Sequence, residues 1–241
     1  MTDLPAVCLI LLTYAPPEHP QRAEAAANTL TAALDHIRYS GPLNVHIADD
    51  GSPEPHRVML REIAGGYPQV GTVGVTNAER GGYGASYNRA TQSVHSGNEI
   101  VIPLEDDWRL TRDLDLDPLV ATLREDALGI RCIRLGYVGF TQKLFGEFLH
   151  TPAGPMLLID PASPEPHVFA GHARIETREF ERAVGPWGEG VAAGPTEFEV
   201  SHRSEARRGN AWPLDYGPAS QRSDALFVHE DGGVGLGEIV P

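Results

Sequence analysis

The sequence predicts an α/β protein with a mostly parallel sheet flanked by helices and a smaller mixed or antiparallel part in the C-terminal half. From residue 7 to residue 104, apolar runs of strand length alternate with Ala-rich or amphipathic helical segments. This β-α-β-α-β-α-β order is the pattern of a parallel sheet with right-handed crossovers. After residue 108 the apolar runs are shorter and looser, which favours a meander or hairpins. No linker separates two cores, so residues 1–241 are expected to form one domain.

The first half contains four expected strands and three expected helices. The run Val7-Cys-Leu-Ile-Leu-Leu-Thr13 is typical of a central parallel strand that is covered on both faces. Gly41-Pro42 and Gly65-Gly66 stop the first two helices. Ser52-Pro53 has the form of a helix N-cap followed by proline at the first helical position. The expected strands cover residues 7–13, 43–48, 70–76 and 100–104, and the expected helices cover 18–38, 53–64 and 85–94.

The second half is expected to hold shorter elements around a Gly/Pro-rich segment that contains Trp187. The glycine-rich tail after residue 229 is expected to be flexible or lid-like. The expected strands cover residues 129–135, 137–140, 144–150, 156–159 and 226–229, and the expected helices cover 116–126, 176–183 and 196–208.

The composition restricts the classes of partner. Lys and Arg total 19 against 33 Asp and Glu, which gives a net charge of −14. Such a surface repels polyanions and disfavours non-specific binding to nucleic acid or membrane surfaces. Arg203, Arg207 and Arg208 are the clearest local exception, either as a basic patch or as a solvated helix face.

The sequence also predicts a cytoplasmic protein. It contains no run of eighteen apolar residues, so no membrane span is expected. The N-terminus has no basic region before its first apolar run, which argues against a signal peptide. The two cysteines, Cys8 and Cys132, lie inside apolar runs and are expected to be buried thiols in a reducing compartment.

Polar side chains follow three of the expected strands at the point where each strand ends. The carboxyl ends of parallel strands meet at one edge of a sheet, where ligands bind in α/β proteins. Adjacent carboxylates repel one another unless a cation joins them, and Mg²⁺ commonly binds carboxylates together with substrate phosphates. The alternative is that these acids form turns or cap helices and face water. The clusters are Thr13-Tyr14, Asp49-Asp50 and Glu105-Asp106-Asp107.

Four segments in order carry a family resemblance: LLTYAPP, ADDGS, NAERGGYGASYNRA and PLEDDW. Together they resemble the family 2 glycosyltransferases, which have the GT-A fold. The resemblance covers about residues 6–110 and continues only in fragments beyond them. A Rossmann dehydrogenase is disfavoured because no G-x-G-x-x-G follows the first strand, and a P-loop is absent as well.

The resemblance implies a pocket for a nucleoside-diphosphate sugar. Asp49 and Asp50 would bind its base and ribose, and Thr13 and Tyr14 would line the same pocket. The loop beside the donor would be shaped by Arg80, Gly81, Gly82 and Asn88. Arg80 would meet a phosphate or lie on the surface.

The resemblance also implies a Mn²⁺ or Mg²⁺ site. Glu105 and Asp107 occupy the two acidic positions of the family's Asp-x-Asp-type motif, and Asp106 lies between them beside the donor. Glu at the first position departs from the usual Asp, which makes Asp107 the more direct ligand. His229, at the end of the last apolar run, resembles the histidine that often completes the site.

The general base departs most from the family pattern. The usual catalytic Asp falls on Pro195, which leaves Glu197 and Glu189 as the nearest carboxylates. Thr196 has the form of a helix N-cap. The sugar or another planar group would stack on Trp108, Trp187 or Tyr137, although such aromatics more commonly pack in a core.

The resulting expectation is an inverting, metal-dependent glycosyl transfer from a UDP-, GDP- or dTDP-sugar to a hydroxyl. Residues 1–110 would bind the donor and 111–241 the acceptor. The acceptor would be a glycan or a small molecule, or else a hydroxymethylated DNA base, against which the negative charge counts. Two alternatives remain. A nucleotidyltransferase would normally show a basic Gly-rich loop after its first strand, and a non-catalytic nucleotide-sugar-binding module would explain the incomplete base motif.

Overall fold

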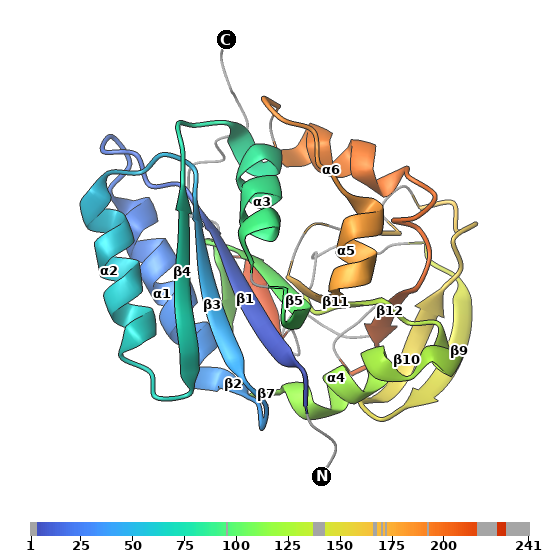
Figure 1. The fold of residues 1–241 in the computed structure, drawn as a ribbon. Helices are drawn as coiled ribbons and strands as arrows, with labels where there is room; N and C mark the ends of the chain where they lie inside the picture. The colour runs from blue at the N-terminus through green and yellow to red at the C-terminus, as the bar shows by residue number, and fades with distance from the viewer. Residues whose placement is uncertain are drawn as a thin grey trace.

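A nine-stranded sheet runs through both halves of the chain, in the order β4-β3-β1-β5-β11-β8-β12-β10-β9 (Figure 1). The computed structural model describes residues 4–94, 96–136, 143–165, 168–169, 171, 173–191, 193–215 and 226–229. The first four strands of this order are mutually parallel, and within the described strands of this sheet antiparallel pairs appear only from β11 onward. The expected fold class is therefore confirmed.

The parallel half is centred on β1, which pairs with β3 on one side and β5 on the other. All residues of β1 after the first are buried, because helices cover both faces of the sheet at this point. This burial explains why the strand is apolar along its whole length rather than alternating. The parallel strands are β1 (Ala6–Thr13), β3 (Leu43–Asp49), β4 (Val70–Asn77) and β5 (Asn98–Glu105).

The C-terminal half extends the sheet with short strands of mixed direction. β11 is antiparallel to β5 and to β8, β12 is parallel to β8, and β10 and β9 form an antiparallel hairpin at the edge. Two small sheets pair β13 with β6 and β2 with β7. The strands are β2 (Ile37–Arg38), β6 (Trp108–Leu110), β7 (Leu114–Asp115), β8 (Cys132–Arg134), β9 (Gly146–Thr151), β10 (Gly154–Ile159), β11 (Arg174–Thr177), β12 (Asn210–Pro213) and β13 (Phe227–His229).

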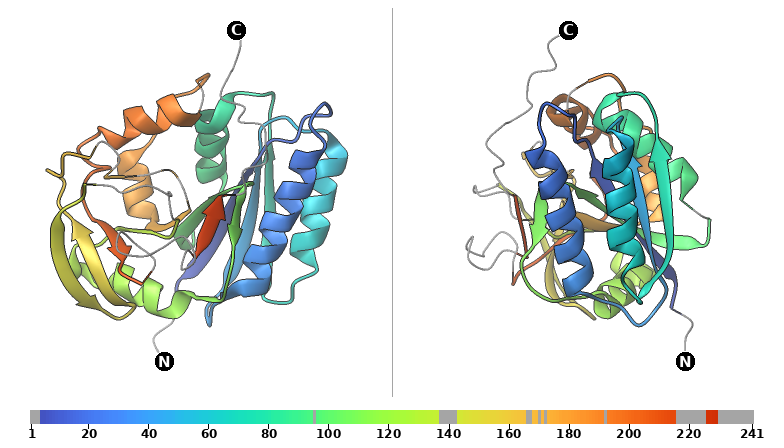
Figure 2. Two further views of the ribbon diagram at one scale, coloured as in Figure 1. Left: turned by 180° about the vertical axis from the view of Figure 1, so that it is seen from behind. Right: turned by 90° about the vertical axis from the view of Figure 1, so that its left-hand side faces the viewer.

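Helices cover both faces of the sheet (Figure 2). On one face, Leu30 and Leu34 of α1 pack in the same cluster as Leu9 and Leu11 of β1. On the other face, α3 and α5 pack in the cluster that holds Ile10 of β1. The helices are α1 (Gln21–His36), α2 (Glu54–Gly65), α3 (Gly82–Ser93), α4 (Leu116–Arg124), the 3₁₀ turn Asp126–Leu128, α5 (Arg178–Val184) and α6 (Ala193–Ser201).

The expected elements of the first half match the structure to within a few residues, whereas several in the second half do not. The helix expected over 176–183 begins at Arg178, because residues 174–177 form β11. The helix expected over 196–208 runs from Ala193 to Ser201. The strand expected over 137–140 and the tail after residue 229 lie outside the described residues. Among the helices described, none is long and apolar enough to cross a membrane.

Candidate active site

The carboxyl ends of β1, β3 and β5 lie side by side. Thr13 is the register partner of Asp49, and Leu12 is the partner of Glu105. The polar residues that end these strands therefore share one edge of the sheet. α3 and α6 contact each other above this edge in Figure 1. This geometry provides the common strand-end site that the sequence predicts.

Asp106 is an internal anchor of this edge. One carboxylate oxygen accepts hydrogen bonds from the Thr13 hydroxyl at 2.9 Å and the Tyr14 amide at 3.1 Å. The other oxygen pairs with the Arg22 guanidinium at 2.7 Å. Burial raises the pKa of Asp106 to about 6, against the lowering effect of the Arg22 charge. Its carboxylate is thus fully engaged in joining β1, α1 and the end of β5.

Asp49 and Asp50 are also engaged by the protein. Asp49 accepts hydrogen bonds from the Ser52 amide and pairs with Arg57 at 3.1 Å. The Ser52 hydroxyl accepts from the Ala15 amide, so Ser52 closes a turn instead of capping α2, whose N-cap is Pro53. The sequence left two interpretations of these acids, a ligand site or a turn, and the structure shows Asp49 bonded within the turn.

The second acid of the turn, Asp50, holds the loop that precedes α3. Its two oxygens accept from the amides of Gly81 and Gly82, each at 2.9 Å, and one also pairs with Arg89 at 3.1 Å. Burial raises the pKa of Asp50, while these hydrogen bonds lower it. Gly82 has φ +82°, and a Cβ there would lie 2.9 Å from the Val191 carbonyl oxygen, so glycine is required on both counts.

Tyr14 and Arg80 form a pair at the same edge, in which Tyr14 is half-buried and Arg80 is exposed. The Arg80 guanidinium lies 4.4 Å from the centre of the Tyr14 ring and 3.4 Å from its hydroxyl. This stack brings a cation and an aromatic face beside the ends of β1 and β4. Both features are suited to an anionic ligand that carries a planar base.

Asn88 clamps α3 to the segment that contains Trp187. Its amide group accepts from the Trp187 N–H and donates to the Trp187 carbonyl, both at 2.9 Å. It also donates to Glu189 at 3.0 Å. Glu189 is exposed and Asn88 is buried, so the two sequence-predicted residues are brought together by a structural contact.

Glu105, Asp107 and Glu197 form an acidic cluster at the end of β5. Burial, together with the charges of Asp107, Glu197 and Asp106, raises the pKa of Glu105 to about 8. Asp107 Oδ2 lies 3.3 Å from His229 Nε2, because β13 pairs with β6 and sets His229 opposite Trp108. Carboxylates from β5 and α6 and an imidazole from β13 thus gather at the strand-end edge.

This cluster fits a divalent cation in its chemistry. Asp107 Oδ1 is buried and has no hydrogen-bond partner, so a hard oxygen donor is left for another group. The mutual repulsion of the carboxylates would fall if a cation joined them. Within the described part of the chain, no three His, Cys, Asp or Glu side chains already stand in the arrangement of a metal site. Asp107, Glu105 and His229 are the residues that would hold the ion.

Three residues lie near the expected position of the general base: Glu197, Glu189 and Thr196. The two carboxylates among them lie in different environments. Glu197 is half-buried and accepts a hydrogen bond from the Gly171 amide. Glu189 is exposed and bound to Asn88. Thr196, expected as a helix cap, lies inside α6 and donates to the Gly188 carbonyl at 2.8 Å. Glu197, which acts electrostatically on Glu105, is the carboxylate that belongs to the cluster.

A buried ion pair beside the cluster was not foreseen from the sequence. Arg174 and Glu176 are each 1% exposed and pair at 2.9 Å. Arg174 also donates to the Gly171 carbonyl at 2.7 Å and lies 5.0 Å from the centre of the Phe169 ring. The Tyr87 hydroxyl donates to Glu176 at 2.7 Å. The sequence signal is the pair of opposite charges two residues apart, which lie on one face of a strand, whereas Glu176 is expected from the sequence to begin a helix.

Several other expected groups are occupied elsewhere. Trp108 and Trp187 are 7% and 3% exposed, so they pack in the core and do not offer a stacking platform, while Tyr137 lies outside the described residues. Arg203 donates to the carbonyls of Val184 and Pro186, and Arg207 donates to the Pro161 carbonyl. These arginines fasten loops rather than form a basic patch.

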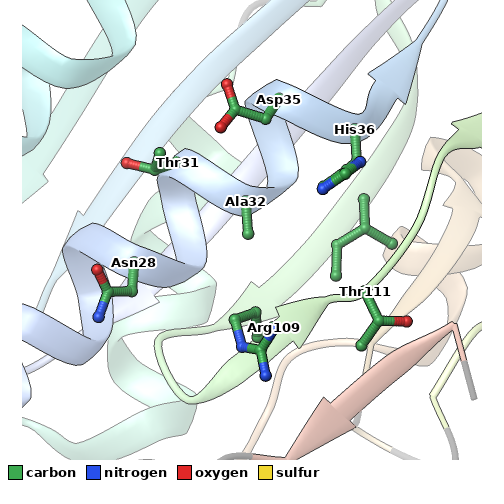
Figure 3. Close-up of a pocket in the computed structure, with 8 residues that line it drawn as sticks. Asn28, Thr31, Ala32, Asp35, His36, Arg109 and Thr111 are labelled. Carbon is green, nitrogen blue, oxygen red and sulfur yellow. The ribbon is translucent and has the colours of Figure 1, made fainter. Parts of the chain in front are cut away.

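A cavity of about 350 Å³ lies between α1 and residues 109–111 (Figure 3). Two of its side chains are already engaged: Asp35 accepts from the Tyr67 hydroxyl at 2.8 Å, and His36 lies 2.9 Å from the Asp113 carboxylate. Both belong to the end of α1 that precedes the start of β3, away from the acidic cluster. The lining residues are Asn28, Thr31, Ala32, Asp35, His36, Arg109, Leu110 and Thr111.

Comparison with known proteins identifies the architecture. No family model and no curated protein sequence matches the chain. TarS 1-349 of S. aureus, solved in complex with UDP, matches with a TM-score of 0.65 and 13% identity, over 88% of this chain and 59% of TarS 1-349. The chain has a GT-A-like glycosyltransferase fold. A mannosyltransferase from Pyrobaculum calidifontis, solved with GDP-Man and Mn²⁺, shares this fold with a TM-score of 0.55 and 15% identity, over 89% of this chain and 58% of that one.

The bifunctional glycosyltransferase WbbM also shares the GT-A-like fold, with a TM-score of 0.53 and 10% identity over 96% of this chain. The chain spans 59%, 58% and 47% of the three matched proteins, so each of them contains more than this fold. At these identities the likeness establishes the fold, and membership of family 2 stays a prediction.

Proposed function

We propose that this protein is a metal-dependent glycosyltransferase that moves a sugar from a nucleoside-diphosphate sugar to an acceptor hydroxyl. The observation that carries the proposal is the acidic cluster of Glu105, Asp107 and Glu197 at the carboxyl end of β5, in a GT-A-like fold. The charges of Asp107 and Glu197 contribute to the raised pKa of Glu105, and perturbed carboxylates of this kind are typical of functional sites.

The donor pocket is proposed at the ends of β1, β3 and β4. Tyr14, which is half-buried, stacks there with the exposed Arg80, and the two would contact the base and a phosphate. Asp49, Asp50, Gly81 and Asn88 would act mainly by fixing the turns around the pocket, because their polar atoms already bond within the protein. UDP and GDP-Man in the matched structures support a nucleoside-diphosphate donor.

The transfer step is proposed as one displacement with inversion. The acceptor oxygen forms a bond to the anomeric carbon, the bond from that carbon to the diphosphate oxygen breaks, and the electron pair leaves with the diphosphate. Glu197 takes the acceptor proton as general base, and Glu189, held by Asn88 at 3.0 Å, is the alternative. A divalent cation held by Asp107, Glu105 and His229 would neutralise charge on the diphosphate, with Mn²⁺ supported by one matched structure.

The remaining features of the proposal concern the acceptor. Residues 1–110 would bind the donor and residues 111–241 would present the acceptor to it. A glycan or small-molecule acceptor is favoured over a DNA base by the net charge of −14, which repels polyanions.

The test is donor hydrolysis and binding with a panel of UDP-, GDP- and dTDP-sugars, with Mn²⁺ or with EDTA. Turnover that requires the metal is the expected result, with water acting as acceptor. Metal-dependent binding without turnover would instead favour a non-catalytic nucleotide-sugar-binding module. Absence of binding to every donor, with or without Mn²⁺, would overturn the proposal.

A further inference from the structure

We infer that Gly171 and Arg174 position the carboxylate of Glu197. The inference rests on the proposed function, in which Glu197 is the general base. It assigns a role to two residues that no sequence motif marks, and to a buried charge that the proposed transfer step does not itself use.

Gly171 connects Glu197 to Arg174. Its amide N–H donates to Glu197 Oε1, and its carbonyl accepts from Arg174 Nη1 at 2.7 Å. One glycine thus binds the carboxylate with its N–H and the guanidinium with its carbonyl. Since Oε1 is anchored, the position of the second oxygen of Glu197 is restricted as well.

Arg174 is rigidly held. Its guanidinium pairs with Glu176 through Nε at 2.9 Å and through Nη2 at 3.3 Å, and it lies 5.5 Å from the centre of the Trp187 ring. The side chain is 1% exposed. A guanidinium fixed by a carboxylate on its own strand and by surrounding rings has little freedom, so the Gly171 carbonyl that it binds is fixed too.

Position 171 leaves little room for a side chain beside Glu197. A Cβ built there would lie 3.2 Å from both the carboxyl carbon and Oε1 of Glu197. That separation is shorter than ordinary van der Waals contact, so a larger residue would push the carboxylate away from the amide. The absence of a side chain is therefore part of how Glu197 is seated.

The connection leads to the acidic cluster. β11 is antiparallel to β5, with Thr177 opposite Ile100 and Glu176 opposite Val101. Residues before β11 therefore lie toward the end of β5 that carries Glu105. The charge of Glu197 raises the pKa of Glu105, which places the two carboxylates in electrostatic reach. Gly171 and Arg174 are thus positioning residues at the edge where transfer is proposed.

The experiment measures Mn²⁺-dependent hydrolysis of the donor that the panel identifies, across pH, for Gly171→Ala and for Glu197→Asp. Both changes separate the carboxylate from the Gly171 amide. Because Glu197→Asp alters only a half-buried side chain, it can still be measured if Gly171→Ala does not fold. We expect kcat to fall about tenfold or more, since small misplacements of a reacting group are costly. In Gly171→Ala, where the carboxylate remains that of a glutamate, the ascending limb of the pH profile should move to higher pH, because a carboxylate that loses a hydrogen-bond donor has a higher pKa. Affinity for UDP should stay within about twofold.

The control and the double variant separate this inference from the proposed function. Gly65→Ala, where a Cβ would meet nothing within 4 Å, should keep the wild-type kcat and pH profile. In a Glu197→Gln background, Gly171→Ala should cause no further loss, because the group that it positions is gone. If Glu197→Gln is inactive but Gly171→Ala and Glu197→Asp keep the wild-type kcat and pH profile, the positioning role is wrong while the base stands. If Glu197→Gln keeps full turnover, Glu197 is not the general base. If the wild-type protein hydrolyses no donor, the proposed transferase function is wrong. In either case this inference is wrong as well.

Discussion

Asp107 has two carboxylate oxygens in different surroundings. Oδ2 faces His229 at 3.3 Å, and Oδ1 is buried without a hydrogen-bond partner. A buried, unsatisfied oxygen costs about 1–3 kcal/mol, which a bound cation would recover. Asp107, which the sequence predicts as the most direct metal ligand, therefore has a carboxylate oxygen whose hydrogen-bonding capacity the protein leaves unused.

Asp107→Asn should remove most of the metal-dependent part of donor binding. Removing the negative charge weakens cation binding, so we expect the Mn²⁺-dependent gain in UDP affinity to fall by about tenfold or more. Isothermal titration of UDP with Mn²⁺ and with EDTA measures this gain. Asp113→Asn changes an exposed carboxylate that pairs with His36 and should leave the gain intact. An unchanged gain in Asp107→Asn would contradict the assignment.

Glu197→Gln should abolish turnover and preserve donor affinity. A glutamine cannot accept the acceptor proton, and loss of a general base lowers rates by about 10²- to 10⁴-fold. The control is Glu199→Gln, two residues along the same helix, because Glu199 pairs with Arg203 and is exposed. Steady-state hydrolysis and UDP titration are the measurements. Full activity of Glu197→Gln with an inactive Glu189→Gln would move the role to Glu189.

At the scale of elements, the loop before α3 and the Trp187 segment form a connected frame. Asp50 binds the amides that start α3, the Gly81 carbonyl accepts from Gly190, and Asn88 binds Trp187. The frame joins the proposed donor side of the site to the segment that leads into α6. Asp50, Gly81 and Asn88 stand at positions of the motifs that resemble the glycosyltransferase family. In this chain their hydrogen bonds are made to other groups of the protein.

Asn88→Ala should weaken this frame measurably. It would leave the buried N–H and carbonyl of Trp187 without their partner, at about 1–3 kcal/mol for each unsatisfied group. We expect the free energy of unfolding to fall by about 2–4 kcal/mol in urea titrations. Asn28→Ala, on the exposed side of α1, is the matched control and should change stability by less than about 0.5 kcal/mol. A neutral Asn88→Ala would show that the clamp is dispensable.

The elements that the sequence predicted best are the strands that consist of one continuous apolar run. β1 and β5 are buried on both faces, so their apolar runs are unbroken and their ends are sharp. The strand β11 was not predicted, because its residues Arg174 and Glu176 are charged and not apolar. These charges are buried in the folded sheet, where they pair with each other. α6 ends at Ser201 although helix-favouring residues continue, and the residues that follow form turns in which Arg207 donates to the Pro161 carbonyl.

At the scale of the molecule, the sequence predicted the parallel half of the sheet but not the spatial order of its strands. The alternation of strands and helices indicated that β1, β3, β4 and β5 are parallel, so their shared edge could be predicted with the residues that end them. The order β11-β8-β12-β10-β9 depends on long-range pairings between short strands, which periodicity does not encode. The candidate base shows the same limit, since the contact of Glu197 with Gly171 joins positions 26 apart in the chain.

The stability of the whole molecule should depend on His46. Burial lowers the pKa of His46 from 6.5 to about 4, and its Nε2 lies 3.1 Å from the Thr76 hydroxyl. Between these pH values the unfolded chain binds a proton that the folded one excludes. His46 therefore contributes stability above pH 6.5 that is lost as pH falls toward 4, by about 3 kcal/mol at most.

Urea titrations at pH 7.5 and pH 5 measure this dependence in the wild type and in His46→Gln. The variant should lose less stability than the wild type on acidification. Comparing the two is necessary because Asp106, whose pKa is raised to about 6, acts in the opposite direction in both proteins. Equal losses in the two proteins would show that His46 is not the group responsible.

Asp106 stands between two residues proposed to hold a cation, yet it points away from them into Thr13, Tyr14 and Arg22. The carboxylate in the middle thereby fixes the backbone of its neighbours before any ligand arrives. Glu105 and Asp107 need not be gathered at the moment of binding, so little conformational entropy remains to be lost when a cation enters. In this chain the affinity for a metal would thus be set in part during folding, by an acid that never touches it.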